Sequence, residues 1–206
     1  MEMITDFYLF LISVILVSLS GVMSPGPLFA VTIAKASKEK NAGFLISIGH
    51  GVVEFPIMFL IYFGFAWVFA SPPAQKVIGL VGGALMVYLG LNMLKTRKEM
   101  EKESSYFKYG SIVSGILATA GNPYFLFWWA TIGAFLIMNA SFFGFVGFLL
   151  FAIIHWFCDL VWNIFVSLTV FKSRRFWTRR VHEIVFGFCF LVLMGFGVWF
   201  IISALL

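Results

Sequence analysis

The apolar and polar positions along the chain divide it into six long apolar segments separated by short polar connections. Most of these segments reach the roughly 17–25 residues that an α-helix needs to cross a bilayer. The pattern therefore predicts an all-α, polytopic membrane protein with six transmembrane helices, forming one domain over residues 1–206. The predicted spans are 7–34, 42–69, 77–94, 111–137, 142–171 and 183–205, joined by connections at 35–41, 70–76, 95–110, 138–141 and 172–182.

The composition supports a lipid environment. Of the 206 residues, 62% are hydrophobic and 11% are charged, and the mean hydropathy is +1.02. A soluble domain carries about 25% charged residues, so a fold of this size in water could not cover so many apolar side chains. The acidic residues Glu2 and Asp6 precede the first apolar segment. A secretory signal has a basic start, so we expect this segment to be a retained helix of a cell-membrane protein.

Charge is distributed unevenly between alternate connections. Thirteen of the fourteen Lys and Arg residues lie in 35–41, 95–110 and 172–182, and the opposite side has only Lys76. The positive-inside rule therefore predicts that these three basic loops are cytoplasmic and that both termini lie outside. The net charge of +5 is then explained by the orientation of the chain in the membrane. Because the basic residues are divided among short loops, we expect no nucleic-acid partner.

Two of the predicted spans contain strong helix breakers. The first carries "SPGP" at 24–27, and the fourth carries "GNP" at 121–123. In lipid, non-helical backbone persists only where protein covers it or where it lines a water-filled cavity. A single proline can simply kink a helix. Because breaks occur at matching places in both halves, we interpret them as part of a substrate-binding site made by Ser24, Pro25, Gly26, Pro27, Asn122 and Pro123.

The chain contains a weak internal repeat. "HGVVE" at 50–54 and "HWFCD" at 155–159 are 105 positions apart, and the same offset relates Gly82 to Gly187 and Gly90 to Gly195. The two repeats would cover about 7–95 and about 111–206. Each has three spans, so the second must enter the membrane from the opposite face. This predicts two inverted-topology three-helix repeats, a plan common among secondary transporters.

The repeated motifs place ionisable residues inside apolar segments. His50 and Glu54, like His155 and Asp159, are four residues apart and share a helix face. An ionised side chain at mid-bilayer costs at least about 2.5–3.5 kcal/mol, which favours a functional role. These residues could couple transport to protons, bind a cationic substrate group, hold a metal ion, or form a structural pair between helices.

Other classes of site find less support. No further tract of His or Cys supplements the two motifs, so we expect no dedicated metal centre and no cofactor. Cys158 and Cys189 lie in apolar runs and are expected to be buried thiols. No P-loop and no motif of a soluble hydrolase occurs, so we expect no enzyme; an intramembrane enzyme using His and Asp is the alternative.

The tryptophans and glycines of the spans are assigned to packing. We expect the tryptophans that lie deep in the spans, Trp128, Trp129, Trp156 and Trp162, to be packing residues. The glycines of "GLVGGALMVYLG" permit close helix contact, either within one chain or in a homo-oligomer.

In order along the chain, the motifs are "SPGP", "AGFLISIGH", "GGALMVYLGLNMLK", "GNPYFLFWW", Asp159 and "FGFCFLVLMG". This set resembles the lysine-exporter (LysE/RhtB-type) family of amino-acid efflux permeases over essentially the whole chain. The resemblance implies export of amino acids or similar small metabolites from the cytoplasm, driven by antiport with protons. It assigns functional roles to the Ser-Pro-Gly-Pro and Asn-Pro segments and to Asp159.

The chain departs from this family pattern at "HGVVE", because many relatives have no acid at the position of Glu54. Related branches of the family handle metal ions. A divalent metal-ion exporter that uses His50, Glu54, His155 and Asp159 therefore stays as the alternative function.

Overall fold

The computed structural model describes residues 6–65, 72–98, 109–173, 176 and 179–205. Every regular element in these residues is helical, which confirms the predicted all-α class. Five helical segments are long and apolar enough to cross a membrane, and six are when the bent pair α1 and α2 counts as one span. The helices are α1 (Phe7–Val22), α2 (Pro27–Ala36), α3 (Ala42–Leu60), α5 (Pro72–Lys98), α6 (Ser111–Ala120), α7 (Pro123–Trp128), α8 (Ala134–Phe142), α9 (Gly144–Ser173) and α10 (Arg179–Leu205), with π-helical turns η1 (Ile61–Phe65) and η3 (Trp129–Gly133).

Both predicted helix breaks are present. Helix α1 ends at Val22 and α2 begins at Pro27, and the two helices are bent by 72°. Proline suits the first position of a helix, because its missing N–H has no intrahelical partner there. In the second half, α6 ends at Ala120 and α7 begins at Pro123. Beyond the second break, α7 continues through η3 into α8.

Two predicted connections are partly wrong. Residues 138–141 are helical, and α8 ends only at Phe142. Their polar side chains bond within the helix: Asn139 Nδ2 donates to Phe135 O and Ser141 Oγ donates to Ile137 O, each at 2.8 Å. The chain instead turns at Gly144, whose φ of 71° favours glycine. Helix α5 begins at Pro72, so most of the predicted connection 70–76 is helical as well.

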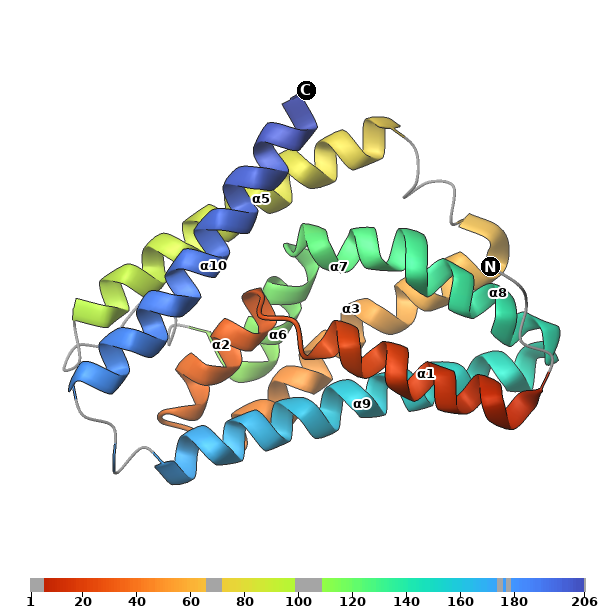
Figure 1. The fold of residues 1–206 in the computed structure, drawn as a ribbon, viewed down its shortest axis with the longest axis horizontal. Coiled ribbons are helices and arrows are strands. Elements are labelled where there is room, and N and C mark those ends of the chain that lie inside the picture. The colour runs from red at the N-terminus through yellow and green to blue at the C-terminus, as the bar shows by residue number, and fades with distance from the viewer. Residues whose placement is uncertain (1–5, 66–71, 99–108, 174–175, 177–178, 206) are drawn as a thin grey trace.

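Helices α5 and α10 lie side by side over much of their length and form an antiparallel pair at one margin of the molecule (Figure 1). Glycines bring their backbones together. A Cβ on Gly83 would lie 2.8 Å from Gly197 O, and a Cβ on Gly197 would lie 2.9 Å from Gly83 O. The glycines that we expected to permit close helix contact therefore do so within one chain.

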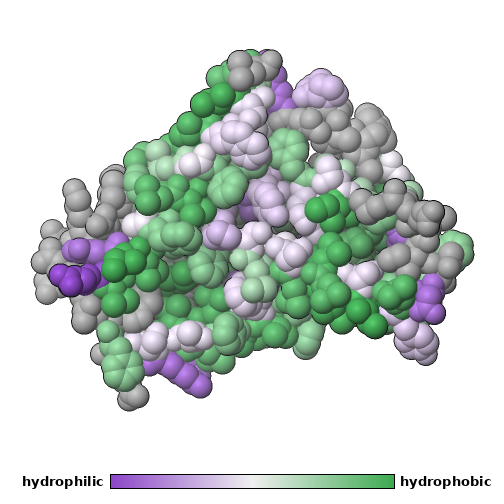
Figure 2. All heavy atoms as spheres, viewed as in Figure 1, coloured by the Kyte–Doolittle hydropathy of each residue, from purple (hydrophilic) through white to green (hydrophobic). Residues whose placement is uncertain are grey.

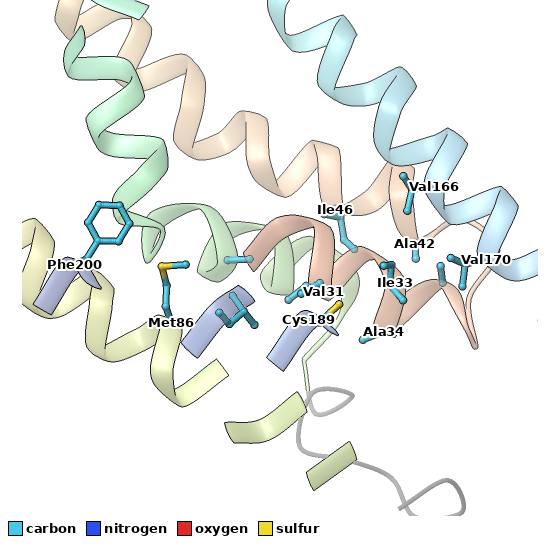
Figure 3. Packing of buried hydrophobic residues seen from close by; sticks show 14 residues of the cluster. Val31, Ile33, Ala34, Ala42, Ile46, Met86, Val166, Val170, Cys189 and Phe200 are labelled. Atoms are coloured by element: carbon cyan, nitrogen blue, oxygen red, sulfur yellow. The ribbon is translucent and has the colours of Figure 1, made fainter. Parts of the chain in front are cut away.

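Two apolar clusters flank the middle of α3 and α9. The first gathers residues of α2, α3, α5, α6, α9 and α10, and Figure 3 shows most of it. The second gathers residues of α1, α3, η1, α7, η3, α8 and α9. Along α3, Ile46 belongs to the first cluster and Ile57 to the second; along α9, Val166 belongs to the first and Ala152 to the second. The motifs at 50–54 and 155–159 lie between these residues, in the interval between the two clusters.

The helix ends that flank the three basic connections lie at one end of the molecule, on the left in Figure 1. Side chains join them: Lys35 Nζ donates to Tyr109 O, Ser111 Oγ to Glu39 Oε2, and Ser167 Oγ to Lys40 O at 3.1 Å. Apolar residues cover most of the face in Figure 2, and strongly hydrophilic residues lie at its margins. This surface suits a multi-pass membrane protein. Cys158 and Cys189 are buried free thiols, as predicted.

Candidate functional site

Helices α3 and α9 approach each other closely enough to bring their motifs together. A Cβ on Gly43 would lie only 2.1 Å from Asn163 O, so α3 packs against the backbone of α9 at this point. On another face of α3, a Cβ on Gly49 would lie 2.1 Å from Ile112 O of α6. Only glycine permits these approaches, because any side chain would overlap the opposing carbonyl. Helix α3 is therefore held between α6 and α9.

The two histidines and two acids form one buried cluster. His50 Nε2 is 2.9 Å from Glu54 Oε1, and His155 Nε2 is 3.3 Å from the same oxygen. Asp159 is more distant: Oδ1 is 3.5 Å from His50 Nε2, and Oδ2 is 3.7 Å from His155 Nε2. All four side chains are at most 6% exposed. Each acid thus contacts the histidine of its own helix and the histidine of the other helix.

Hydroxyl groups orient both imidazole rings from the far side. Ser18 Oγ of α1 is 2.7 Å from His155 Nδ1, and Thr119 Oγ1 of α6 is 2.9 Å from His50 Nδ1. Thr119 Oγ1 also donates to Gly115 O at 2.8 Å, which uses its only proton. His50 Nδ1 must therefore carry a hydrogen and donate to Thr119. The contact between His50 Nε2 and Glu54 then requires a further proton, on Nε2 or on the carboxyl group.

The cluster opens onto a cavity of about 180 Å³ that both helix breaks line. A single water needs only about 10–15 Å³ by such a measure, so the cavity has room for a small molecule. A Cβ on Gly26 would lie 3.9 Å from Asn122 Nδ2, so the two breaks face each other. Nine of the ten predicted site residues line the cavity: Ser24, Pro25, Gly26, Pro27, His50, Glu54, Asn122, His155 and Asp159.

Pro123 is the tenth predicted site residue, and the structure places it elsewhere. It is buried and does not line the cavity. A Cβ on Gly82 of α5 would lie 2.8 Å from Pro123 Cδ, so the proline ring packs against that helix. Its contribution is to start α7 and seat it against α5.

Three of the four tryptophans assigned to packing line the cavity. They are Trp128, Trp129 and Trp162. The indole of Trp128 stacks on His155 with ring centroids 5.1 Å apart, and Trp129 meets the same imidazole edge-on at 5.1 Å. The fourth, Trp156, donates its indole N–H to Ser47 O at 3.1 Å. Trp128 and Trp129 belong to the second apolar cluster and Trp162 packs against the first, so these three tryptophans are packing residues, as expected, and also line the cavity.

Sequence reasoning also missed four polar residues around the cluster. Besides Ser18 and Thr119, Asn163 lines the cavity and donates from Nδ2 to Asp159 O at 3.0 Å. Thr32 Oγ1 lies 3.2 Å from Asn163 Oδ1 and 2.8 Å from Leu28 O, and its single proton can be directed at either oxygen. Each is an isolated polar residue within an apolar span. That signal was available, but a Ser or Thr can also bond within its own helix, so the signal is weak.

Part of the cluster has the donor types of a metal site. His50, Glu54 and Asp159 each offer one ligand atom, and these atoms lie within 4.8 Å of one another. However, the 2.9 Å contact between His50 Nε2 and Glu54 is a hydrogen bond. A metal would have to displace the proton that this bond holds, because ligands bind in their deprotonated form. In the structure, the same atoms that could hold a metal ion form a hydrogen bond between His50 and Glu54.

The broken apolar helices, the internal cavity and the buried titratable cluster define a multi-pass helical membrane protein built to admit a small polar ligand. The chain belongs to the LysE type translocator family, whose model matches residues 19–204. It is therefore a membrane translocator, and the resemblance found in its motifs is confirmed.

One curated relative matches nearly end to end. The chain is 26% identical over 198 residues to the "Putative amino acid efflux protein YcgF" of Bacillus subtilis (strain 168), covering 92% of this chain and 93% of the relative. No solved structure matches the chain.

Proposed function

We propose that this protein is a secondary active transporter that exports amino acids or similar small metabolites from the cytoplasm, with protons as the coupling ion. One observation carries the proposal: the same cavity is lined by two helix breaks and by four buried titratable groups. Helix breaks supply unpaired backbone groups for a substrate. The histidines and acids supply a group that can gain and lose a proton. The relative named for amino acid efflux supports the same substrate class.

We further propose that residues 7–95 and 111–206 are inverted-topology repeats. Reciprocal contacts support this proposal. Ser18 of α1 contacts His155 of the second half, whereas Thr119 of α6 contacts His50 of the first half. Glu54 and Asp159 likewise each contact the histidine of the opposite half. A two-fold axis in the membrane plane would exchange these contacts and would allow the two halves to alternate access to one site.

We propose that both termini lie outside and that the three basic loops are cytoplasmic, which sets the direction of export. Lys40 and Ser141 are exposed and belong to opposite sides in this topology. In a chain in which Ser replaces Cys158 and Cys189, a cysteine replacing Ser141 should react with an impermeant reagent in intact cells. A cysteine replacing Lys40 should react only after the cells are opened. Reaction of the Lys40 position in intact cells would reverse the orientation.

Reconstituted vesicles test the transport activity. Vesicles that contain the protein are loaded with labelled amino acids, and their efflux is followed with and without an imposed pH gradient. We expect the gradient to accelerate efflux of at least one amino acid at least tenfold over vesicles without protein. We expect this efflux to persist in a chelator of divalent ions, because the proposed coupling uses protons and no metal ion.

The same experiment separates the alternative function. Transport of a divalent ion without transport of any amino acid would identify a metal-ion exporter. Amino-acid efflux that a chelator abolishes would also contradict the proposal. Efflux that ignores the pH gradient would retain an amino-acid exporter but remove the proton as coupling ion.

A further inference from the structure

We infer that the cavity selects zwitterionic amino acids with apolar side chains, and that cationic and anionic amino acids bind it poorly. This inference rests on the proposed function and narrows its substrate class. Three properties of the cavity carry it: hydrogen-bonding atoms of both kinds that have no partner, a balanced set of charges, and apolar walls.

The cavity contains carboxylate oxygens that are ready to receive an ammonium group. Glu54 is 1% exposed and Asp159 is 4% exposed, yet Glu54 Oε2 and Asp159 Oδ2 have no hydrogen-bond partner among the described residues. Leaving a buried acceptor unpaired is costly, and the cost is greater for a charged group. An α-ammonium group carries three N–H donors and a positive charge. Such a group, bound next to either carboxylate, would supply the missing donor.

The same cavity contains unpartnered donors that suit a carboxylate. Trp129 Nε1 and Trp162 Nε1 are buried and have no hydrogen-bond partner among the described residues. An indole N–H can only donate, so it requires an acceptor. The N-terminus of α2 also borders the cavity through Leu28 and Phe29, and no side chain caps it. Its free N–H groups and the positive end of its dipole favour an anion.

The acidic and basic side chains that line the cavity contact one another, and none is left to pair with a charged side chain of a substrate. The acidic and basic residues of the cavity, within the described ranges, are two acids and two histidines; Tyr124 adds a phenol, and no Lys or Arg lines it. The four side chains pair with one another across α3 and α9. When both histidines are protonated the four charges cancel, and a substrate whose own charges cancel preserves that balance. A lysine side chain would bring a cation and a glutamate side chain an anion, each without a buried partner.

Most of the remaining wall is apolar and suits a hydrocarbon or aromatic side chain. Leu28, Phe29, Met86, Phe125 and Phe196 line the cavity together with the tryptophans. Burying an apolar side chain against them is favourable in proportion to its area, at about 25 cal/mol per Å². Ser24, Asn122, Tyr124 and Asn163 add polar groups to the lining, but they are fewer than the apolar residues, so an apolar side chain should gain more than a polar one of the same size.

Exchange measurements on the unmodified protein test the selectivity. Vesicles are loaded with unlabelled leucine, and uptake of external labelled leucine is measured while competitors are added. Phenylalanine should compete at a concentration at least tenfold lower than lysine or glutamate. Leucinol, which lacks the carboxylate, and 4-methylpentanoate, which lacks the ammonium, should each compete at least tenfold less well than leucine itself.

Matched tryptophan variants test the assigned donors. Trp162→Phe removes one unpartnered indole N–H, so the preference for leucine over leucinol should fall at least threefold. Trp129→Phe should have the same effect and serves if the first variant fails to fold. Trp156→Phe removes an indole N–H that is already bonded to Ser47 O, so that variant should keep the preference.

The outcomes separate the inference from the proposed function. Competition by lysine or glutamate at least as strong as that by phenylalanine would overturn the inference and leave an amino-acid exporter. An unchanged preference in both Trp162→Phe and Trp129→Phe would remove the tryptophans as carboxylate donors and overturn the assigned site. Exchange of no amino acid at all would overturn the proposed function itself.

Discussion

The two His-x-x-x-acid motifs have the same spacing, but the structure uses them differently. Glu54 lies 2.9 Å and 3.3 Å from the two histidines through a single oxygen. Asp159 lies 3.5 Å and 3.7 Å from them, and its Oδ2 has no hydrogen bond among the described residues. Glutamate has one more methylene, which lets it reach both rings. Glu54 thus ties the cluster together, whereas Asp159 has an oxygen available for a ligand or a proton.

The hydroxyl groups behind the histidines sharpen the difference. Thr119 Oγ1 gives its proton to Gly115 O and accepts from His50, so the α3 pair retains an additional proton. Ser18 Oγ can donate to His155 Nδ1, which leaves the hydrogen of that ring on Nε2, facing the acids. A neutral His155 therefore satisfies all its contacts. The two motifs thus share a spacing but differ in the hydrogen bonds that their histidines make.

The largest expected effect comes from Asp159→Asn. Asparagine keeps the size of the side chain but cannot release a proton, so the coupling cycle is interrupted. We expect net efflux driven by a pH gradient to fall to the level of vesicles without protein. Exchange between equal pools of substrate needs no net proton movement, so it should persist, at a lower rate because the proposed ammonium site loses one of its two carboxylates. Both rates are measured in the same reconstituted vesicles.

Glu54→Gln is the matched control for that experiment. We expect it to lower exchange and net efflux together, because it disturbs the whole cluster. If the Asp159→Asn protein showed gradient-driven efflux at the rate of the unmutated protein, both motifs would have to be assigned a structural role.

The loss of stability should be greater for Glu54→Gln than for Asp159→Asn, which is the opposite of the order expected for net efflux. Removing one partner of a buried ion pair costs about 3–5 kcal/mol, because a buried charge is left unpaired. Glu54 makes the two shortest contacts, so Glu54→Gln should lower the free energy of unfolding by about 3 kcal/mol. Asp159→Asn should cost less. Unfolding of the two variants in the same detergent compares them, and a greater loss for Asp159→Asn would show that Glu54 does not tie the cluster.

The smallest expected effects come from the hydroxyls. Ser18→Ala and Thr119→Val each remove one hydrogen bond to a histidine, worth about 1 kcal/mol. We expect each to reduce exchange two- to fivefold through misplacement of its ring. In Glu54→Gln, where the rings have already lost their common partner, the added loss should be smaller, and a double-mutant cycle measures it. Full additivity would mean that the hydroxyls do not act through the cluster.

Sequence reasoning located the elements of this site because they depend on local chemistry. The proline-rich segments at 24–27 and 121–123 interrupt helices wherever they occur, so their positions in the chain were enough to place both breaks. Acids within long apolar segments identify Glu54 and Asp159 as exceptional for the same reason. The prediction of a connection at 138–141 was wrong because Asn139 and Ser141 resemble loop residues but form hydrogen bonds within their own helix.

Only the tertiary structure decided how these elements meet. Whether His50 faces Asp159 depends on the crossing of α3 and α9, which the glycine contact at Gly43 permits. Whether a tryptophan packs or lines a cavity depends on what the other helices place around it. Glu54 and Asp159 differ in their contacts with the histidines because glutamate is longer by one methylene. The effect of that length depends on the distance between α3 and α9. The chain alone determined which residues are costly to bury in lipid, and the packing of the helices determined which partners each of them has.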